Sequence, residues 1–370
     1  MQTIVFYISG HGFGHAARQV EVIRALLARR TDLAIIVKTS APSWLFERGL
    51  DGPVEVTPLE TDTGVVQIDS LTVDVDASIN RAREFHERLD ARTDAEASRL
   101  HTHRARLVVG DIPPLACSAA AKAGIPSAAI SNFTWDWIYA GYDETSVRAP
   151  SLIPTLASAY ARATVAWRLP LHGGFESCPR VVDVPLVARR GTRKPGAVRR
   201  QFGLPEHPPL VLVAFGRYGI ADIDWSAIAA LEEYRVVFTD ATAPSIASAA
   251  LASGRFVSID EREMDGCGVR YEDLVAAVDV VVTKPGYGMI AECAANDAAM
   301  LYTSRGRFRE YDVLTSGLPR LVRSHFIPHD DLFAGRWGPH LDALLAQPRP
   351  APPRIDGAQV IADAVLTLLD

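Results

Sequence analysis

Two histidines lie in a glycine-rich segment near the start of the chain, SGHGFGHAAR at positions 9–18. A neutral imidazole between a strand and a helix can take a proton from a hydroxyl nucleophile. Such a base is commonly oriented by a carboxylate on its other ring nitrogen, and Asp111, at the end of another predicted strand, is the best-placed carboxylate. We therefore expect His15, His11 and Asp111 to be catalytic. Helix capping or core packing of a histidine, and an N-cap role for Asp111, stay open as alternatives.

The same segment does not match a dinucleotide-binding fingerprint. His15 stands where the third glycine of G-x-G-x-x-G should be, and the second predicted strand ends in Lys38-Thr39 instead of an acid. This pattern argues against a nicotinamide cofactor.

A group of aromatic and polar residues follows a later strand, in SNFTWDWIY at positions 131–139. Such residues can bind the hydroxyl groups and the apolar edge of a sugar-like acceptor, although packing between domains is an alternative. The candidate acceptor-binding residues are Phe13, Asn132, Trp135 and Asp136.

Two glycine-containing turns in the second half, FGRYG at 215–219 and TKPGYGMIAE at 283–292, each follow a predicted strand. Backbone N–H groups at such helix starts can hold a diphosphate. No Walker motif occurs, which excludes an ordinary P-loop kinase. The candidate phosphate-binding residues of these turns are Gly216, Arg217, Gly219, Lys284, Gly286 and Gly288. Glu292, early in the second helix, could accept from ribose hydroxyls, and Glu310 and Asp312 lie in a later loop within reach of the same cleft.

The sequence predicts no metal site and no cofactor. His101 with His103, and His325 with His329, lack an evident third ligand, and two D-x-D pairs at 74–76 and 222–224 are interpreted as loop acids. The four cysteines are too far apart for a C-x-x-C motif.

Alternating strands and helices must position these residues. In the first half we expect strands at 3–9, 33–38, 106–110 and 127–131, and helices at 16–29, 78–104 and 116–123. A proline-rich stretch at 173–209, with a short helix at 197–202, is interpreted as a linker. Beyond it we expect strands at 210–215, 234–239, 255–259, 279–283 and 299–303, and helices from 288, at 330–346 and at 357–369. The pattern predicts two doubly wound α/β domains that work in the cleft between their strand ends.

Composition bounds the remaining function classes. The chain has 370 residues, a net charge of −6 and 48% hydrophobic residues, which suits a folded protein and argues against coating nucleic acid through bulk charge. No secretion signal or membrane-spanning run is evident, so we expect a cytoplasmic protein without a transmembrane segment.

Together, these motifs resemble the GT-B superfamily of nucleotide-sugar glycosyltransferases. They are most similar to the glycosyltransferase-like N-terminal domain of plant-type L-arabinokinases, through SGHGFGHAAR, VVGDIPPLAC, SNFTWDWIYAGY, DVPLVARR and KPGYGMIAE. The kinase domain that follows in those proteins is absent here, so sugar phosphorylation is not expected.

The resemblance implies residues 1–180 as an acceptor domain, 181–350 as a donor domain, and a helix within 351–370 that packs back on the first. It implies His15 as general base held by Asp111, Glu292 on the donor ribose, Gly286 and Gly288 near the diphosphate, and Glu310 and Asp312 near the donor sugar. Arg270 is a further candidate donor-binding residue, beside the expected site of the nucleotide base. The E-Y-D sequence and Arg217 depart from the family pattern.

The expected activity is therefore an inverting, metal-independent transfer from a nucleoside-diphosphate sugar, with a UDP-sugar as the expected donor, to a hydroxyl of a small-molecule or glycan acceptor. A non-catalytic sugar-nucleotide-binding module and a GT-B nucleotide-sugar epimerase are the alternatives. The oligomeric state is left open by the sequence.

Overall fold

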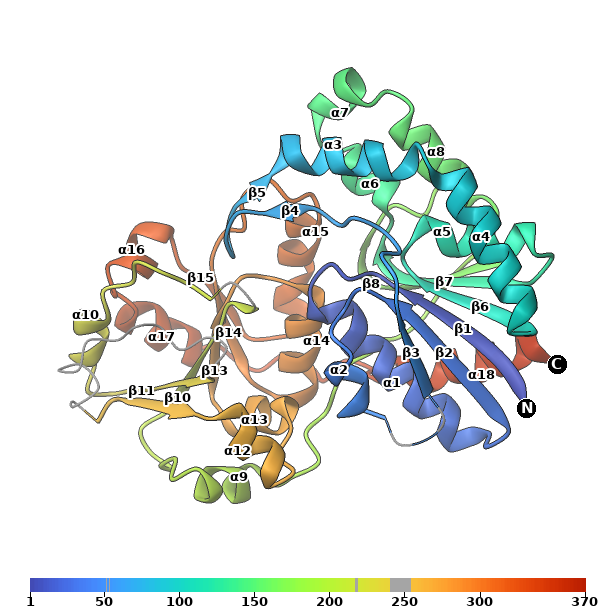
Figure 1. Cartoon of the computed structure of the whole chain (residues 1–370). Coiled ribbons are helices and arrows are strands. Elements are labelled where there is room, and N and C mark those ends of the chain that lie inside the picture. Colours follow the sequence, from blue (N-terminus) through green and yellow to red (C-terminus); the bar gives the residue numbers. More distant parts are fainter. Residues whose placement is uncertain (51, 53, 217–218, 240–253) are drawn as a thin grey trace.

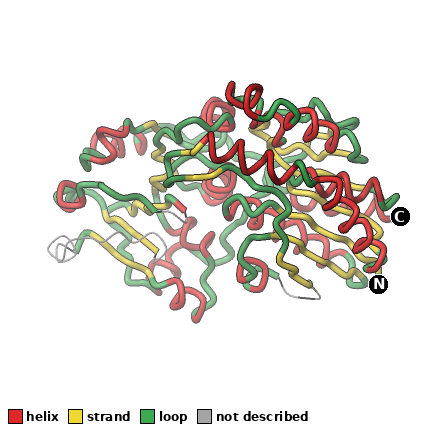
Figure 2. The backbone as a smooth tube through the Cα atoms, turned by 45° about the horizontal axis from the view of Figure 1, so that its top comes forward, coloured by secondary structure: helices red, strands yellow, loops and turns green. Residues whose placement is uncertain are grey.

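The computed structural model describes residues 1–50, 52, 54–216, 219–239 and 254–370. Two α/β domains lie side by side, each built on its own parallel sheet (Figure 1). Strands lie at the centre of both halves and helices cover them (Figure 2). Arg217, a candidate donor residue, lies outside the described residues.

The first domain contains a seven-stranded sheet in the order β3-β2-β1-β6-β7-β8-β9, with every pairing parallel. Its strands are β1 (Gln2–Ile8), β2 (Leu33–Thr39), β3 (Val54–Pro58), β6 (Ala105–Asp111), β7 (Ser127–Phe133), β8 (Val165–Gly173) and β9 (Val181–Asp183). Its helices are α1 (Phe13–Arg29), α2 (Trp44–Glu47), α3 (Val75–His86), α4 (Leu89–Thr102), α5 (Pro114–Lys122), α6 (Trp135–Tyr139), α7 (Asp143–Arg148) and α8 (Leu152–Tyr160). A small hairpin of β4 (Val66–Gln67) and β5 (Val73–Asp74) completes it.

The second domain contains a six-stranded sheet in the order β12-β11-β10-β13-β14-β15, again with parallel pairings. Its strands are β10 (Leu210–Ala214), β11 (Arg235–Thr239), β12 (Phe256–Ile259), β13 (Val280–Thr283), β14 (Ala299–Tyr302) and β15 (Ser324–Phe326). Its helical elements are α9 (Pro195–Gln201), α10 (Trp225–Ala229), α12 (Glu261–Gly266), α13 (Tyr271–Ala277), α14 (Tyr287–Asn296), α15 (Glu310–Gly317), the 3₁₀ helix η2 (Leu318–Arg320), α16 (His329–Phe333) and α17 (Gly338–Leu345).

The strands that were predicted from continuous apolar runs are the central strands of both sheets. The residues of β1 from Ile4 to Ile8 are all fully buried, as a strand covered by helices on both faces requires. The two-domain α/β architecture expected from the sequence is therefore confirmed.

Two helix predictions are wrong in their extent. The single helix expected at 78–104 is two helices, α3 and α4, because α3 packs against α7 and α8 whereas α4 packs against α5. The helix expected at 330–346 is likewise divided into α16 and α17, with Gly335 at a φ of 68° between them. Short-range helical patterning does not reveal such breaks, which depend on the packing partners.

The chain passes between the domains twice. The first crossing follows β9, and the second leads into α18 (Gly357–Leu369), which returns to the first domain and packs against α1. The two crossings touch, since Val187 pairs with Asp356 and the Gly357 N–H donates to the Leu186 carbonyl (3.0 Å).

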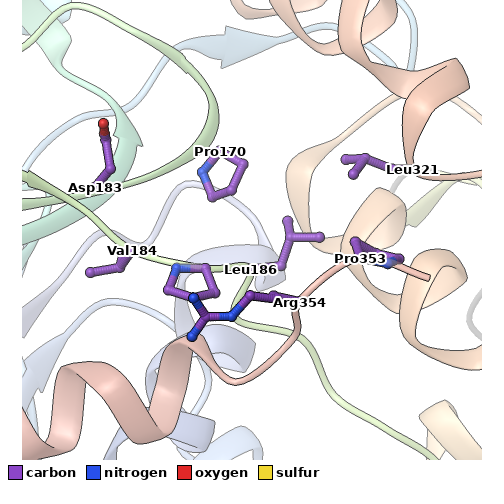
Figure 3. A pocket seen from close by; sticks show the side chains of 8 residues that line it. Pro170, Asp183, Val184, Leu186, Leu321, Pro353 and Arg354 are labelled. Atoms are coloured by element: carbon purple, nitrogen blue, oxygen red, sulfur yellow. The ribbon is translucent and has the colours of Figure 1, made fainter. Parts of the chain in front are cut away.

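A hollow of about 330 Å³ lies at these crossings (Figure 3). None of the candidate site residues lines it; the lining residues are Pro170, Asp183, Val184, Pro185, Leu186, Leu321, Pro353 and Arg354.

Candidate active site

His15 and Asp111 are brought together by two neighbouring strands of the first sheet. Strands β1 and β6 end side by side, with Ile8 opposite Asp111, and α1 begins directly after β1. Gly12 makes the turn with a φ of 78°, a conformation that favours glycine. His15 Nδ1 lies 2.8 Å from Asp111 Oδ1, and both side chains are buried. The alternative N-cap role of Asp111 is wrong, because α5 begins at Pro114 and its N-cap, Pro113, makes no side-chain capping bond.

Arg18, which the sequence analysis did not single out, binds the same carboxylate. Its Nε donates to Asp111 Oδ2 (2.5 Å), and its Nη2 donates to Asp111 Oδ1. Gln19 Nε2 also donates to Oδ2, at 2.7 Å. Burial raises the pKa of Asp111, but the charges of Arg18 and His15 and their hydrogen bonds outweigh it and lower that pKa to about 2. The carboxylate is therefore ionised at neutral pH.

The second candidate histidine, His11, lies in an aromatic environment. Its ring is 5.5 Å from the Trp135 ring and 6.0 Å from the Phe308 ring, and its Nδ1 accepts the Val65 N–H (3.4 Å). Burial, followed by the charge of Arg305, lowers the pKa of His11 well below its usual value. His11 is thus a neutral side chain beside His15, with ring centroids 6.5 Å apart.

A further carboxylate, Asp62, lies near these histidines and was missed because it belongs to a loop without a recognisable pattern. Ser9 Oγ donates to its Oδ1 (2.8 Å), and Trp135 Nε1 donates to its Oδ2 (2.9 Å). Burial raises the pKa of Asp62 to about 6 despite these bonds.

The candidate acceptor residues are largely engaged by other protein groups. Trp135 is 1% exposed and packs against Phe133, and Asp136 accepts from Ser177 Oγ (2.7 Å). Phe13 lies edge-on to Trp44 with the ring centroids 5.7 Å apart. The ring contacts of Trp135 with His11, Phe133 and Tyr139 are packing within the first domain, whereas the alternative considered was packing between the domains. The acceptor role of Trp135 remains a prediction.

Asn132 connects the two domains. Its Oδ1 accepts from Arg18 Nη1 (2.9 Å), and its Nδ2 donates to Glu310 Oε1 (2.8 Å). Glu310 is the first residue of α15 and is buried, whereas Asp312, its partner in the predicted donor-sugar pair, is exposed. The two acids therefore differ in environment.

Residues 305–310 of the second domain, which we call the 305–310 segment, dock on the first domain. Phe308 is 3% exposed and belongs to the same apolar cluster as Phe133. On either side of it, Arg307 Nη1 pairs with Glu144 (2.6 Å) and Arg309 Nη1 donates to the Trp137 carbonyl (2.6 Å). The segment thus fixes the second domain beside the candidate base.

The glycine-rich turn of the second domain meets that of the first. A Cβ added to Gly288 would lie 3.4 Å from Gly14 Cα, so the first turns of α14 and α1 approach backbone to backbone. Two helix N-termini meeting in this way create a local positive potential. Gly286 precedes α14, and Lys284 precedes Gly286.

Two cationic side chains lie beside this turn. Arg305 Nη1 contacts Glu310 Oε2 (3.2 Å) and the Pro285 carbonyl (3.4 Å), while its buried Nε has no hydrogen-bond partner within the described ranges. Burial lowers the pKa of Arg305. Burial, followed by the charge of Arg305, also lowers the pKa of Lys284 to about 7. Both cations therefore lack full compensation by protein groups.

Glu292 is buried on α14 and is partly engaged. Its Oε1 accepts from Arg189 Nε (2.7 Å), while Oε2 has no hydrogen-bond partner among the residues that the structure describes. Burial raises the pKa of Glu292 against the opposing charge of Arg189.

The remaining donor candidates lie on turns or on α13. Arg270 is the N-cap of α13, with Nη1 3.6 Å from Glu272. Gly216 and Gly219 have φ values of 73° and 60°.

The structure places no cluster of three or more potential metal ligands within the described part of the chain. The acids of the two D-x-D pairs include helix caps: Asp74 caps α3 and Asp224 caps α10. Among the described helices, none has the length and apolar character needed to span a membrane.

Comparison with known proteins gives a consistent picture. No family model matches the chain. It is 31% identical over 345 residues to an L-arabinokinase from Arabidopsis thaliana, a match that covers 92% of this chain and 32% of that protein. The chain thus spans about a third of the length of the curated relative it matches.

Solved glycosyltransferase structures share its fold over the whole chain. A glycotransferase of kitacinnamycin superposes with a TM-score of 0.66 at 16% identity, covering 100% of this chain and 99% of that one. The calicheamicin glycosyltransferase CalG4 gives 0.62 at 15% identity, covering 100% and 98%. Phytolacca americana UGT2, complexed with UDP-2fluoro-glucose and pterostilbene, gives 0.61 at 12% identity, covering 100% and 94%.

Proposed function

Because the chain has the GT-B fold, we propose that it is a glycosyltransferase that transfers a sugar, with inversion and without a metal, from a nucleoside-diphosphate sugar to an acceptor hydroxyl. A UDP-sugar is the donor to test first. The observation that carries the proposal is the contact of His15 Nδ1 with the ionised carboxylate of Asp111, 2.8 Å away. The fold alone would not distinguish transfer from binding.

The proposed base acts through the free nitrogen of His15. When Nδ1–H donates to Asp111, Nε2 keeps its lone pair and can accept the proton of the acceptor hydroxyl. The hydroxyl oxygen then bonds to the anomeric carbon as the bond from that carbon to the diphosphate oxygen breaks. Attack from the face opposite the leaving group inverts the anomeric carbon, and Asp111 stabilises the imidazolium that forms.

The second domain would receive the leaving diphosphate. Lys284, Arg305 and the N-terminus of α14 supply positive charge at one place, and Arg305 Nε is a buried donor that lacks a partner within the described ranges. These groups can neutralise the negative charge of the leaving diphosphate, which a divalent cation neutralises in metal-dependent transferases.

Other donor contacts follow the sequence prediction. Glu292 offers its unpartnered Oε2 to a ribose hydroxyl, while Arg189 holds Oε1. Both carboxylate oxygens of Glu310 already accept hydrogen bonds, one from Asn132 and one from Arg305. Glu310 would therefore need to give up one of these bonds to accept from a sugar hydroxyl.

The test begins with thermal unfolding in the presence of UDP-, GDP-, ADP-, CDP- and dTDP-sugars, since a ligand that binds the native state raises its melting temperature. With a stabilising donor and an acceptor panel, release of nucleoside diphosphate is then measured. We expect His15→Ala to lower kcat by about 10²–10⁴-fold and to leave donor binding unchanged.

His101→Ala, on the exposed face of α4, is the matched control and should retain full activity. Product formation that survives both His15→Ala and Asp111→Asn would refute the base mechanism. Donor binding by the unaltered chain with no release of diphosphate would indicate a binding module instead.

A further inference from the structure

A continuous chain of buried polar groups runs from the 305–310 segment of the second domain to the base in the first. Arg305 contacts Glu310, Glu310 accepts from Asn132, and Asn132 accepts from Arg18. Arg18 in turn binds Asp111, the partner of His15. Every residue in this series of contacts is at most 8% exposed.

Counting donors at Arg18 shows which hydrogen bonds it makes. Its Nη2 carries two N–H groups, and acceptors for both are present: Asp111 Oδ1 and Ser131 Oγ, the latter at 2.9 Å. His15 Nδ1 also lies 2.9 Å from Nη2, but no further N–H is available for it there. Nδ1 is therefore assigned as a donor to Asp111, which places the lone pair on Nε2.

The orientation of Asn132 is fixed by the same reasoning. Its amide oxygen faces a guanidinium donor of Arg18, and its amide nitrogen faces the Glu310 carboxylate. Reversing the amide would place a donor against a donor and an oxygen against a carboxylate. Asn132 thus connects Arg18 to the docked 305–310 segment in a single orientation.

The charge of Arg18 bears directly on the protonation of His15. A buried carboxylate beside a histidine favours imidazolium, which has no lone pair with which to accept a proton. Arg18 places a positive charge on that carboxylate and next to the ring, which disfavours imidazolium. Among the described residues, two further ionisable groups interact with His15: Asp62, which opposes this effect, and His11, which is neutral.

We propose that Arg18 is a positioning residue that disfavours the imidazolium form of His15 and leaves Nε2 free, and that Asn132 and Glu310 hold Arg18 in place only while the 305–310 segment is docked. The base would then be competent when the two domains are together. The catalytic meaning of this inference rests on the proposed function, but its physical content does not.

The test measures the pH midpoint at which His15 titrates, by NMR of the full chain labelled with ¹⁵N-histidine. The signal of His15 is identified by its loss in His15→Gln. We expect Arg18→Met to raise the midpoint by about one pH unit or more, because the opposing charge is gone. Arg18→Lys keeps the charge and should restore most of the original midpoint.

Asn132→Ala and Glu310→Ala test the connection to the second domain. Both variants should raise the midpoint of His15, but by less than Arg18→Met does. Glu310→Gln can still accept from Asn132 and should leave the midpoint unchanged. Arg307→Gln is the matched control, since it removes another contact of the 305–310 segment without touching these groups.

If His15 has the same pH midpoint in Arg18→Met as in Arg307→Gln, then Arg18 does not set the protonation of His15 and the inference is overturned. Should Arg18→Met fail to fold, the same comparison is made with Asn132→Ala. The measurement needs no donor, so a dependence on Arg18 combined with no binding of any sugar nucleotide would refute the proposed function and leave this inference standing. With an active donor, the acid limb of the profile of kcat against pH should shift to higher pH in Arg18→Met, by the same number of pH units as the midpoint of His15.

Discussion

The polar groups at the ends of the two sheets are satisfied to different degrees. In the first domain, the Asp111 carboxylate receives contacts from Arg18, Gln19 and His15. The amide oxygen of Gln19, beside it, has no hydrogen-bond partner within the part of the chain that the structure describes. In the second domain, Arg305 Nε and Glu292 Oε2 are buried without a hydrogen-bond partner among the described residues. Saturated contacts hold a group in one orientation, whereas unsatisfied buried groups gain from a ligand that completes them.

Under the proposed function, this difference matches the two tasks that a transferase divides between its domains. A general base must be held in one tautomer and one orientation through every turnover. A donor site must exchange its ligand, so its charges cannot all be compensated by protein groups. Substitutions at the end of the first sheet should therefore mainly lower stability, whereas substitutions at the end of the second sheet should mainly lower ligand affinity.

The largest expected effect is a loss of stability in the first domain. Asp111→Ala leaves the Arg18 guanidinium buried without its carboxylate, and breaking a buried pair in this way lowers the free energy of unfolding by about 3–5 kcal/mol. Glu292→Ala should cost less than about 2 kcal/mol, because Arg189 keeps a second acidic neighbour, Glu272, at 3.4 Å. Urea denaturation of both variants checks this order, and equal losses would contradict the comparison.

A smaller effect, on affinity alone, is expected in the second domain. Lys284→Met removes an amino group whose pKa is lowered to about 7 by burial. Because the folded protein already disfavours the charged form of this group, we expect little loss of stability. A charged hydrogen bond to phosphate is worth about 1.5–3 kcal/mol, so nucleoside-diphosphate affinity should fall by roughly 10–100-fold. Calorimetric titration beside urea denaturation separates the two quantities. A strongly destabilised variant would show that Lys284 is structural instead.

The smallest expected effect is a pH dependence of diphosphate binding. The pKa of Lys284 is about 7 in the free protein and should rise when an anion binds, so binding takes up a proton above pH 7. Affinity should then decrease as pH rises from 7 to 8, by less than about tenfold. Calorimetry in buffers of different ionisation enthalpy measures the proton directly. Lys284→Met should abolish the uptake, and an uptake that persists in that variant would assign it to another group.

The sequence predicted several buried elements accurately, although β8 (Val165–Gly173), which begins with three buried residues, was missed. The strand expected at 127–131 is β7 (Ser127–Phe133), and the helix expected at 357–369 is α18 (Gly357–Leu369). Strand β15 (Ser324–Phe326) was missed because it is short and its residues are only partly buried or exposed, so no apolar run marks it. The division of the 78–104 helix was missed because both halves carry a helical sequence pattern, and their different packing partners separate them.

The candidate site shows the same limit. The pairing of His15 with Asp111 could be anticipated because both follow strands that end at the same edge of a sheet. Arg18 could have been found from its position, since it lies three residues after His15 and therefore on the same face of the helix. Asp62 had no such signal, because a loop residue is brought to the site only by the path of the chain.

The two crossings between the domains also restrict how the site can open. Because Val187 pairs with Asp356 and α18 is anchored on α1, the second domain is attached to the first at two adjacent places. Two adjacent attachments define an axis, so separation of the domains reduces mainly to rotation about that line. Such a rotation moves residues far from the axis most and those near it least. The side-chain contacts of the 305–310 segment with the first domain, such as Arg307 with Glu144, are among the contacts that such a rotation would break.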